Sequence, residues 1–434
     1  MTTTYDIFAD GTGTSTPNFT TIAAAIIDDT VLATVGIVSL RCKGNVGPLG
    51  TLDPTTFACS ILNIIPMTGY APGLIPQNDS AVACISSPSA TTPCGGIADG
   101  NVGGSNTTCT AVNISVQIGS ATSSGMFTVS YLDAASGGIL NNVNFVEAKF
   151  RSCSNIGTGT KRLVTIWDQV GAGGTTFATN FQNCIISTET ASSATTEIML
   201  SVSVLSAGNV QNVNFQQSMI DGTNQKGLQG IVRLQTTAAG TVNFNFSNSI
   251  IAAASTSQAT FSTSLGGGSI NIAGSGLITS DNQTNGTNLV IGKLASAVWA
   301  GPAIFDYYLS QASAALNISN TTAGPGTDIL GGIRPRNGTI VDAGPVNLQF
   351  ATPVTLTAGG TGTFMITPQT VSSQAGTDGT HYSACSLGSF SLPAGTKTAY
   401  VQNLDSGGNV IAQGTGALAA GGNNLTQYLC LGMA

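Results

Sequence analysis

The sequence predicts an all-β protein: a right-handed parallel β-helix with a short capping helix, followed by a C-terminal β-sandwich. The first observation is a strand-like phrase, VQNVNFQQSMI at residues 210–220, that recurs through the middle of the chain. The second is a composition that favours turns and strands over helices, with 55 glycines and only 7% charged residues in 434. The third is the absence of a helical period between the recurrences.

The recurrence has the spacing of a solenoid. Related phrases are LNNVNFVEAKF, FATNFQNCIIS and VNFNFSNSIIA, and a weaker one is INIAGSGLITS. Aligning these phrases gives successive gaps of 36, 34, 31 and 27 residues between Phe145, Phe181, Phe215, Phe246 and Ala273. A second strand-like run lies near each phrase, at residues 126–132, 162–168, 197–205, 231–235 and 260–265. Two or three short strands per turn, with no helix, predict a parallel β-helix.

The phrase also predicts which side chains face the core. We expect Val213 and Phe215 to point inward and to stack on their counterparts one coil above and below, while Gln216 and Gln217 make a bend. Amides at equivalent bends can hydrogen-bond along such a stack. The predicted aromatic stack is Phe145, Phe181, Phe215 and Phe246. The predicted bend column is Glu147, Asn183, Gln217 and Asn248.

The N-terminal part is expected to close one end of the solenoid, because open sheet edges must be covered. We assign residues 1–48 to an N-terminal cap and the first coils. The segment FTTIAAAI at 19–26 is short and mostly apolar, which suits a capping helix. Residues 49–120 are rich in Cys and Pro and are assigned to loops around early coils.

The remaining chain divides into the coils and a different C-terminal region. We assign residues 121–346 to the β-helix coils and their terminal cap, with 303–319 as a helix that caps or braces them. Residues 347–434 alternate strand-like runs with Gly pairs and are assigned to a small β-sandwich. A hairpin is expected around the turn at residues 405–408.

Two stretches resemble a known superfamily. The leading phrase DGTGTSTPNFTTIAAAI, residues 10–26, resembles the segment that precedes the first coil in pectin-lyase-like right-handed β-helix proteins. GGIRPRNGTIVDAGPV, residues 331–346, is similar to the ending of surface β-helix proteins. The resemblance covers about three quarters of the chain. It implies the fold and a surface-type or virion-type member, but no particular activity.

Nine cysteines indicate a possible disulfide framework. Five cluster early and two lie near the C-terminus, so we expect a stapled N-terminal region and one C-terminal bridge. The alternative is that the thiols are buried as small apolar fillers. Metal-ligand spacing is absent, because no C-x-x-C occurs and there is one histidine, so no metal and no cofactor is expected. The disulfide candidates are Cys42, Cys59, Cys84, Cys94, Cys109, Cys385 and Cys430.

Catalytic residues are harder to find. β-helix proteins include polysaccharide lyases and hydrolases, and glycoside hydrolysis needs two carboxylates about 5–10 Å apart. The candidates, if the protein is an enzyme, are Glu147, Asp168, Asp221 and Arg151. No pair of acids recurs in one column, since the Arg151 column continues as Ser187, Asp221 and Ala252. We therefore interpret these residues as isolated surface charges and a local ion-pair cluster.

The function expected from these patterns is structural. Few charges allow close packing of copies without self-repulsion, and no basic run suggests nucleic-acid binding. No signal peptide is visible and no membrane insertion is expected. We expect a self-assembling virion fibre, spike or outer-layer protein, trimeric or arrayed, on a virion or extracellular surface, with other particle proteins or glycans as further partners. Two alternatives remain: a glycan-binding or polysaccharide-degrading β-helix protein, and a bacterial surface adhesin or array subunit.

Overall fold

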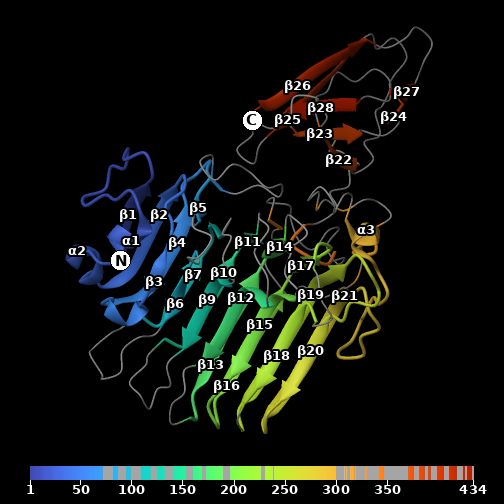
Figure 1. The fold of residues 1–434 in the computed structure, drawn as a ribbon. Coiled ribbons are helices and arrows are strands. Elements are labelled where there is room, and N and C mark those ends of the chain that lie inside the picture. Colours follow the sequence, from blue (N-terminus) through green and yellow to red (C-terminus); the bar gives the residue numbers. More distant parts are fainter. Residues whose placement is uncertain are drawn as a thin grey trace.

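The computed structural model describes the solenoid and the backbone of the C-terminal strands. The residues described are 1–71, 82–86, 94–98, 109–118, 125–131, 140–152, 160–168, 173–188, 196–225, 230–237, 239–299, 307, 309, 313–316, 318, 328–329, 342–346 and the strands between 370 and 432. The described structure consists mostly of strands, and most of these belong to a parallel β-solenoid of about six turns (Figure 1). The predicted all-β solenoid is therefore confirmed.

Each complete coil contributes three strands, which stack on their counterparts in parallel sheets. The first sheet contains β1 (Thr2–Phe8), β2 (Gly36–Lys43), β4 (Cys59–Pro66), β7 (Ala111–Ile114), β10 (Asn142–Val146), β13 (Thr176–Gln182), β16 (Val210–Gln216), β19 (Thr241–Ala253) and β21 (Ser269–Thr279). The second contains β5 (Cys84–Ile85), β8 (Gln117–Ile118), β11 (Lys149–Ser152), β14 (Ile185–Thr188) and β17 (Met219–Gly222), and it joins the first through the long strand β19. The third contains β3 (Gly50–Leu52), β6 (Gly95–Ala98), β9 (Gly125–Tyr131), β12 (Thr160–Asp168), β15 (Thr196–Val204), β18 (Val232–Thr236) and β20 (Phe261–Leu265).

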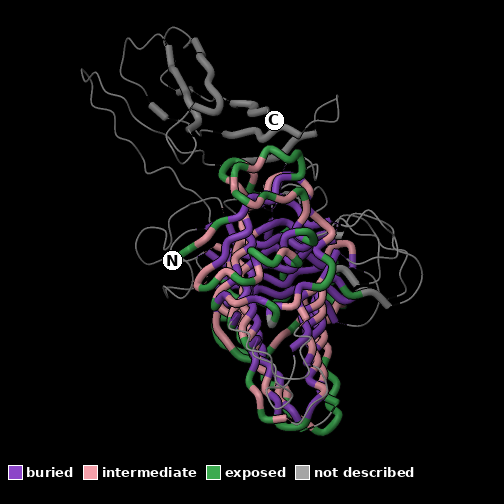
Figure 2. The backbone as a smooth tube through the Cα atoms, turned by 90° about the vertical axis from the view of Figure 1, so that its left-hand side faces the viewer, coloured by how far each residue is buried: buried purple, intermediate pink, exposed green. Residues whose placement is uncertain are grey.

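The recurring phrase places aromatic rings inside the coils. Phe145 pairs in register with Phe181, which pairs with Phe215, which pairs with Phe246, as the sequence predicts. The ring centroids of Phe145 and Phe181 lie 5.0 Å apart, and those of Phe181 and Phe215 lie 5.7 Å apart. One alignment was wrong: the register partner of Phe246 is Gly274 rather than Ala273. Figure 2 shows the buried residues gathered inside the stack of coils and the exposed ones at its turns.

The predicted bend column is also present. Glu147, Asn183, Gln217 and Asn248 occupy the left-handed region, with φ between 46° and 55°. Non-glycine residues adopt this conformation rarely, and Asn does so most easily. Each of these residues turns the chain from a strand of the first sheet into the second sheet, or through the middle of β19. The column therefore sets the corner of the solenoid at four successive coils.

The N-terminal end is closed by two short helices. α1 (Ile22–Ala25) begins at Thr21, whose hydroxyl accepts the Ala24 N–H at 3.2 Å. α2 (Asp29–Leu32) begins at Asp28, whose carboxylate accepts the Thr30 N–H at 2.9 Å. Both are favoured N-cap residues. Ile22, Ala25 and Val31 are buried in the solenoid core. The capping helix predicted within residues 19–26 is therefore confirmed as the shorter α1, and α2 is a second helix that the sequence did not predict. A short 3-10 helix, η1 (Pro54–Thr56), follows β3.

A second apolar cluster lies outside the coils. Its solenoid side is the outward column of the second sheet, made of Ile185, Met219, Ile250 and Ile278. Its covering side includes α3 (Ala295–Val298), Trp299, Tyr307 and Leu309. The rings of Trp299 and Tyr307 pack edge to face, with centroids 5.4 Å apart. This packing supports a lateral brace in the predicted segment 303–319. Most of the helix predicted there lies outside the described residues, and residues 314–316 form a turn.

The C-terminal region contains antiparallel strands, in contrast to the coils. β22 (Thr370–Ala375) pairs with β23 (His381–Ser386), which pairs with β28 (Tyr428–Gly432). β24 (Phe390–Ser391) pairs with β27 (Asn424–Leu425). β25 (Thr398–Leu404) pairs with β26 (Val410–Ala417), which confirms the hairpin predicted around residues 405–408. The packing of these sheets into a sandwich stays a prediction.

The disulfide prediction is not supported among the cysteines whose side chains are described. Cys42, Cys59, Cys84, Cys94, Cys109 and Cys184 are buried, and no pair lies at disulfide distance. Five of them, all except Cys84, fill the interior of the coils as small apolar groups, which was the alternative interpretation. Cys84 lies instead in the outward column of the second sheet, where its Sγ accepts a hydrogen bond from Gln117 Nε2 at 3.8 Å. Burial raises the pKa of the Cys184 thiol to about 12, so this thiol stays protonated at neutral pH. The side chains of Cys385 and Cys430 lie outside the described part of the chain.

Candidate functional site

The outward side of the first sheet carries a continuous row of asparagines. The Nδ2 of Asn113 donates to the Oδ1 of Asn63 at 2.7 Å, and the same bond joins each later coil to the one before it, at 2.6 to 3.0 Å. We call this row the asparagine ladder: Asn63, Asn113, Asn144, Asn180, Asn214 and Asn245. Its side chains alternate along each strand with the buried phenylalanine positions, so one phrase builds both the core stack and the outer ladder.

The ladder lies on a face without charges. None of the six strands that carry the ladder, β4, β7, β10, β13, β16 and β19, contains a charged residue, and neither does β21 beside them. A shorter asparagine row runs beside the ladder, since Asn243 donates to Asn212 at 2.9 Å and Asn271 donates to Asn243 at 2.9 Å. Asn180 also donates to Asn142 at 2.9 Å, so both of its N–H groups are used within these rows. The face thus presents neutral donors and acceptors at the strand spacing of about 4.8 Å.

A hollow of about 390 Å³ interrupts this face near its N-terminal end. Amide groups of Asn113, Asn144, Asn180 and Gln182 line it, together with the apolar residues Ile65 and Val146. A mixture of apolar walls and a few polar groups is typical of a small ligand site. From the sequence alone, the recurring Asn before Phe was interpreted only as part of a strand. Its repetition at 144, 180, 214 and 245 was the signal for the ladder.

Asp168, a catalytic candidate, holds the adjacent coil in place. Its carboxylate is fully buried at the end of β12 and accepts hydrogen bonds from the backbone N–H of Leu205 and Ser206, the latter at 3.1 Å. It also accepts a bond from Asn209 Nδ2 at 2.8 Å. Asn209 in turn accepts the Thr175 N–H at 2.9 Å. Asp168 therefore fixes the turn that leads into the next phrase.

Asp221 lies under the brace rather than on an open surface. It is 1% exposed, and Tyr307 donates its hydroxyl to Asp221 at 2.9 Å. Burial raises the pKa of Asp221, although the bonds from Thr223 and Tyr307 oppose this. Arg151 is 8% exposed and occupies the same column two coils away, with Ser187 between them. The predicted column Arg151, Ser187, Asp221, Ala252 is thus confirmed.

Glu147 belongs to a partly buried charge cluster at the corner. Burial raises the pKa of Glu147, which Lys149 opposes and Asp328 reinforces. Burial lowers the pKa of Lys149 to about 8, against the attraction of Glu147. Asp168 lies on the third sheet and Glu147 at the corner between the first two. The structure thus brings Glu147 together with Lys149, but it does not place Asp168 beside the other catalytic candidates.

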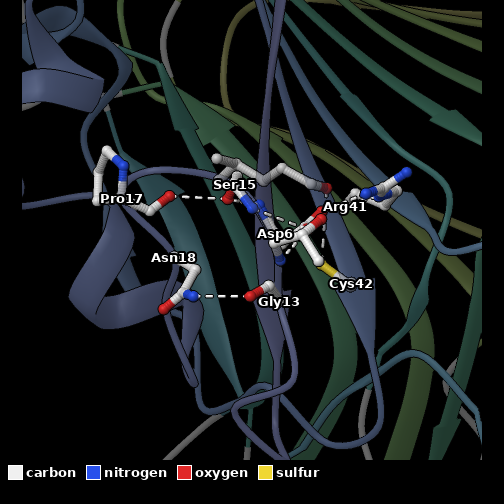
Figure 3. Close-up of polar contacts among 9 residues, drawn as sticks. Asp6, Gly13, Ser15, Pro17, Asn18, Arg41 and Cys42 are labelled. Atoms are coloured by element: carbon white, nitrogen blue, oxygen red, sulfur yellow. Dashed lines mark hydrogen bonds and ion pairs between the residues drawn. The ribbon is translucent and has the colours of Figure 1, made fainter.

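A polar cluster missed in the sequence secures the first coil (Figure 3). Asp6 is fully buried, and its Oδ1 accepts hydrogen bonds from Arg41 Nε at 2.8 Å and Nη2 at 2.6 Å. Its Oδ2 accepts the Thr14 N–H at 2.8 Å. Ser15 Oγ accepts the Asp6 N–H at 2.7 Å and donates to the Pro17 carbonyl at 2.7 Å. These bonds fasten the Gly-rich loop of residues 10–18 onto β1.

The chain matches no protein-family model, no curated protein and no solved structure. Within the described residues, no helix is long and apolar enough to cross a membrane. No group of three or more metal-ligating side chains comes together in that same part of the chain.

Proposed function

We propose that this protein is a structural component that assembles with further copies of itself on a particle or cell surface, as a fibre, spike or outer layer. The observation that carries the proposal is the asparagine ladder on a face with no charges. The ladder runs over six successive coils. Copies can approach such a face without like-charge repulsion or the cost of burying unpaired ions.

The interior supports the same role. The aromatic stack continues from Phe145 through Phe181, Phe215 and Phe244 to Phe261, so every central coil is locked to the next. The described catalytic candidates Asp168 and Asp221 are engaged in buried hydrogen bonds. A solenoid held by both an inner and an outer stack is stiff along its axis, which suits a load-bearing surface element.

The first experiment locates the protein and counts it. Immunogold labelling and quantitative mass spectrometry of the native source should show many copies in an ordered layer. Electron microscopy of the purified chain should show assemblies that Asn214→Lys disrupts, because the substitution places a charge on the neutral face. The matched control is Gln235→Lys on the third sheet, which should leave assembly intact. A few copies in a dispersed pool, with no ordered layer, would contradict the proposal.

A second candidate function is glycan binding, which the hollow on the ladder favours. Planar amides such as Asn113 and Asn144 both donate and accept, and sugar hydroxyls need both. A glycan array probed with the full chain should then give binding that Asn144→Ala removes. Release of reducing ends that Asp168→Asn or Asp221→Asn abolishes, with the fold retained, would indicate an enzyme instead.

A further inference from the structure

The two ends of the solenoid are finished differently. At the N-terminal end, α1 and α2 cover the core with Ile22, Ala25 and Val31. At the C-terminal end, residues 287–290 pair with only part of the last strand of the first sheet. Thr287 bridges Ser275, and Val290 bridges Ile278. The chain itself thus adds a partial strand here and leaves the rest of this end unpaired by any described segment.

One unpaired part is β20, the last strand of the third sheet, which no other described strand follows. The Thr260 carbonyl accepts the Val232 N–H, and the Gly266 N–H donates to the Thr236 carbonyl, so even-numbered residues face β18. Because alternate residues of a strand face opposite neighbours, Phe261, Thr263 and Leu265 direct their N–H and C=O groups away from the solenoid. This outer side of β20 is named the open edge.

The open edge lacks the devices that usually prevent strand pairing. Natural edge strands are blunted by charged side chains, prolines or bulges. β20 has the sequence FSTSL, and no charged residue lies between Arg233 and Asp281. The strand also runs without a register shift along β18. Its backbone is therefore available to another strand with no electrostatic penalty.

Apolar side chains at this end are also incompletely buried. Phe261 is the last ring of the aromatic stack, 5.3 Å from Phe244, and it is only partly buried. Leu265 is 64% exposed. Ile270 and Ile272 of β21 are likewise only partly covered. In every internal coil the equivalent inward positions are sealed by the coil above, so the last coil presents apolar groups that a further layer would bury.

We propose that β20 pairs with β20 of a second copy, which joins two solenoids tail to tail about a two-fold axis. A two-fold axis across the strand makes the paired copies antiparallel and the contact self-complementary, so it closes at two subunits. Because α1 and α2 cover the N-terminal end of the solenoid, a second copy cannot stack head to tail. The uncharged open edge at the C-terminal end is the surface that can pair with the same surface of a second copy. The dimer deepens the proposed function and rests on it, because it supplies the end contact of the assembly.

The test uses the full chain and two edge variants. Thr263→Pro removes an N–H that faces outward and bonds no other residue that the structure describes, so the fold should tolerate it. Ser264→Lys places a charge on an exposed position of the edge. Thr165→Lys is the control, because it adds the same charge on β12 in the middle of the same sheet. Circular dichroism and melting temperature confirm that all three variants fold.

Sedimentation velocity over a range of concentrations gives the answer. The wild type and Thr165→Lys should form dimers, and both edge variants should dimerise at least about tenfold more weakly. Negative-stain images should show wild-type particles with twice the length of one solenoid. Edge variants that dimerise like the wild type would overturn the tail-to-tail contact but leave self-assembly through the asparagine face standing. A wild type that stays monomeric and forms no larger assembly would overturn both.

Discussion

Asp6 and Arg41 lie opposite each other on adjacent parallel strands, and both Nε and Nη2 of Arg41 donate to one carboxylate oxygen of Asp6. The two residues are 35 positions apart, so the contact closes the first coil. Asp6 is also the residue on which the Gly-rich loop of residues 10–18 is folded. One buried carboxylate therefore holds together the first two strands and the loop that precedes the capping helices.

This contact predicts a loss of stability in acid. Burial raises the pKa of Asp6, but hydrogen bonds from Thr14, Arg41 and Ser15 outweigh it and hold the pKa below the ordinary 3.8. A carboxyl with a lowered folded pKa adds stability above its unfolded value, and that stability disappears as the pH falls through the folded pKa. Asp6→Asn should lower the melting temperature at pH 7 and should reduce the free energy of unfolding by about 1–3 kcal/mol. The difference from wild type should shrink below about pH 4. An unchanged gap at pH 3 would contradict the assignment.

The aromatic stack predicts a large cost for removing one ring. Phe215 is fully buried between Phe181 and Phe244. Phe215→Ala should lower the free energy of unfolding by about 3–5 kcal/mol, because the cavity spans three coils and cannot collapse. The adjacent change Asn214→Ala removes one ladder bond and should cost about 0.5–1.5 kcal/mol. Urea denaturation of both variants measures the contrast, and equal losses would show that the ladder stabilises the coils as much as the core.

The corner column predicts a preference among side chains at Gln217. Its φ of 47° strains a β-branched residue and suits asparagine. Gln217→Val should therefore destabilise the protein by about 1–3 kcal/mol, whereas Gln217→Asn should be neutral or stabilising. Thermal unfolding followed by circular dichroism distinguishes them. If valine and asparagine behaved alike, the bend would not constrain this residue.

The corner lysine predicts a dependence on alkaline pH. Burial lowers the pKa of Lys149 to about 8, whereas the unfolded chain titrates near 10.5. Between these values the unfolded state binds more protons, so the contribution of Lys149 to stability rises with pH, by on the order of 1 kcal/mol per unit. Stability measured from pH 8 to 10 should rise for wild type relative to Lys149→Met. The comparison is needed because buried thiols and Tyr131 oppose this trend. A constant difference between the two proteins would refute the shifted pKa.

The solenoid was predictable from sequence because one phrase fixes core, bend and strand together. The gaps between Phe145, Phe181, Phe215 and Phe246 match the strand register, and the four bend residues share one backbone conformation. The last alignment failed at Ala273, because β21 carries glycines where earlier coils carry Phe and the bend residue. A small residue there leaves no side chain to identify the register.

The candidate site was less predictable. The asparagine ladder depends on which side chain faces solvent and on the distance between coils, and the phrase shows only that Asn precedes Phe. The Asp6 cluster joins residues that no local pattern connects. The cysteines were misjudged because burial inside a coil and pairing in a disulfide give the same scattered spacing in sequence.

The matched registers give the solenoid a modular length. Because Phe181 takes the place of Phe215 one coil earlier, the segment between them is an interchangeable unit about 4.8 Å tall. Gain or loss of one such unit changes the reach of the protein by a fixed step while the cap, the brace and the tail edge keep their own sequences. The number of coils therefore sets the length of the molecule, and this number can change without any change in the sequences of the two ends.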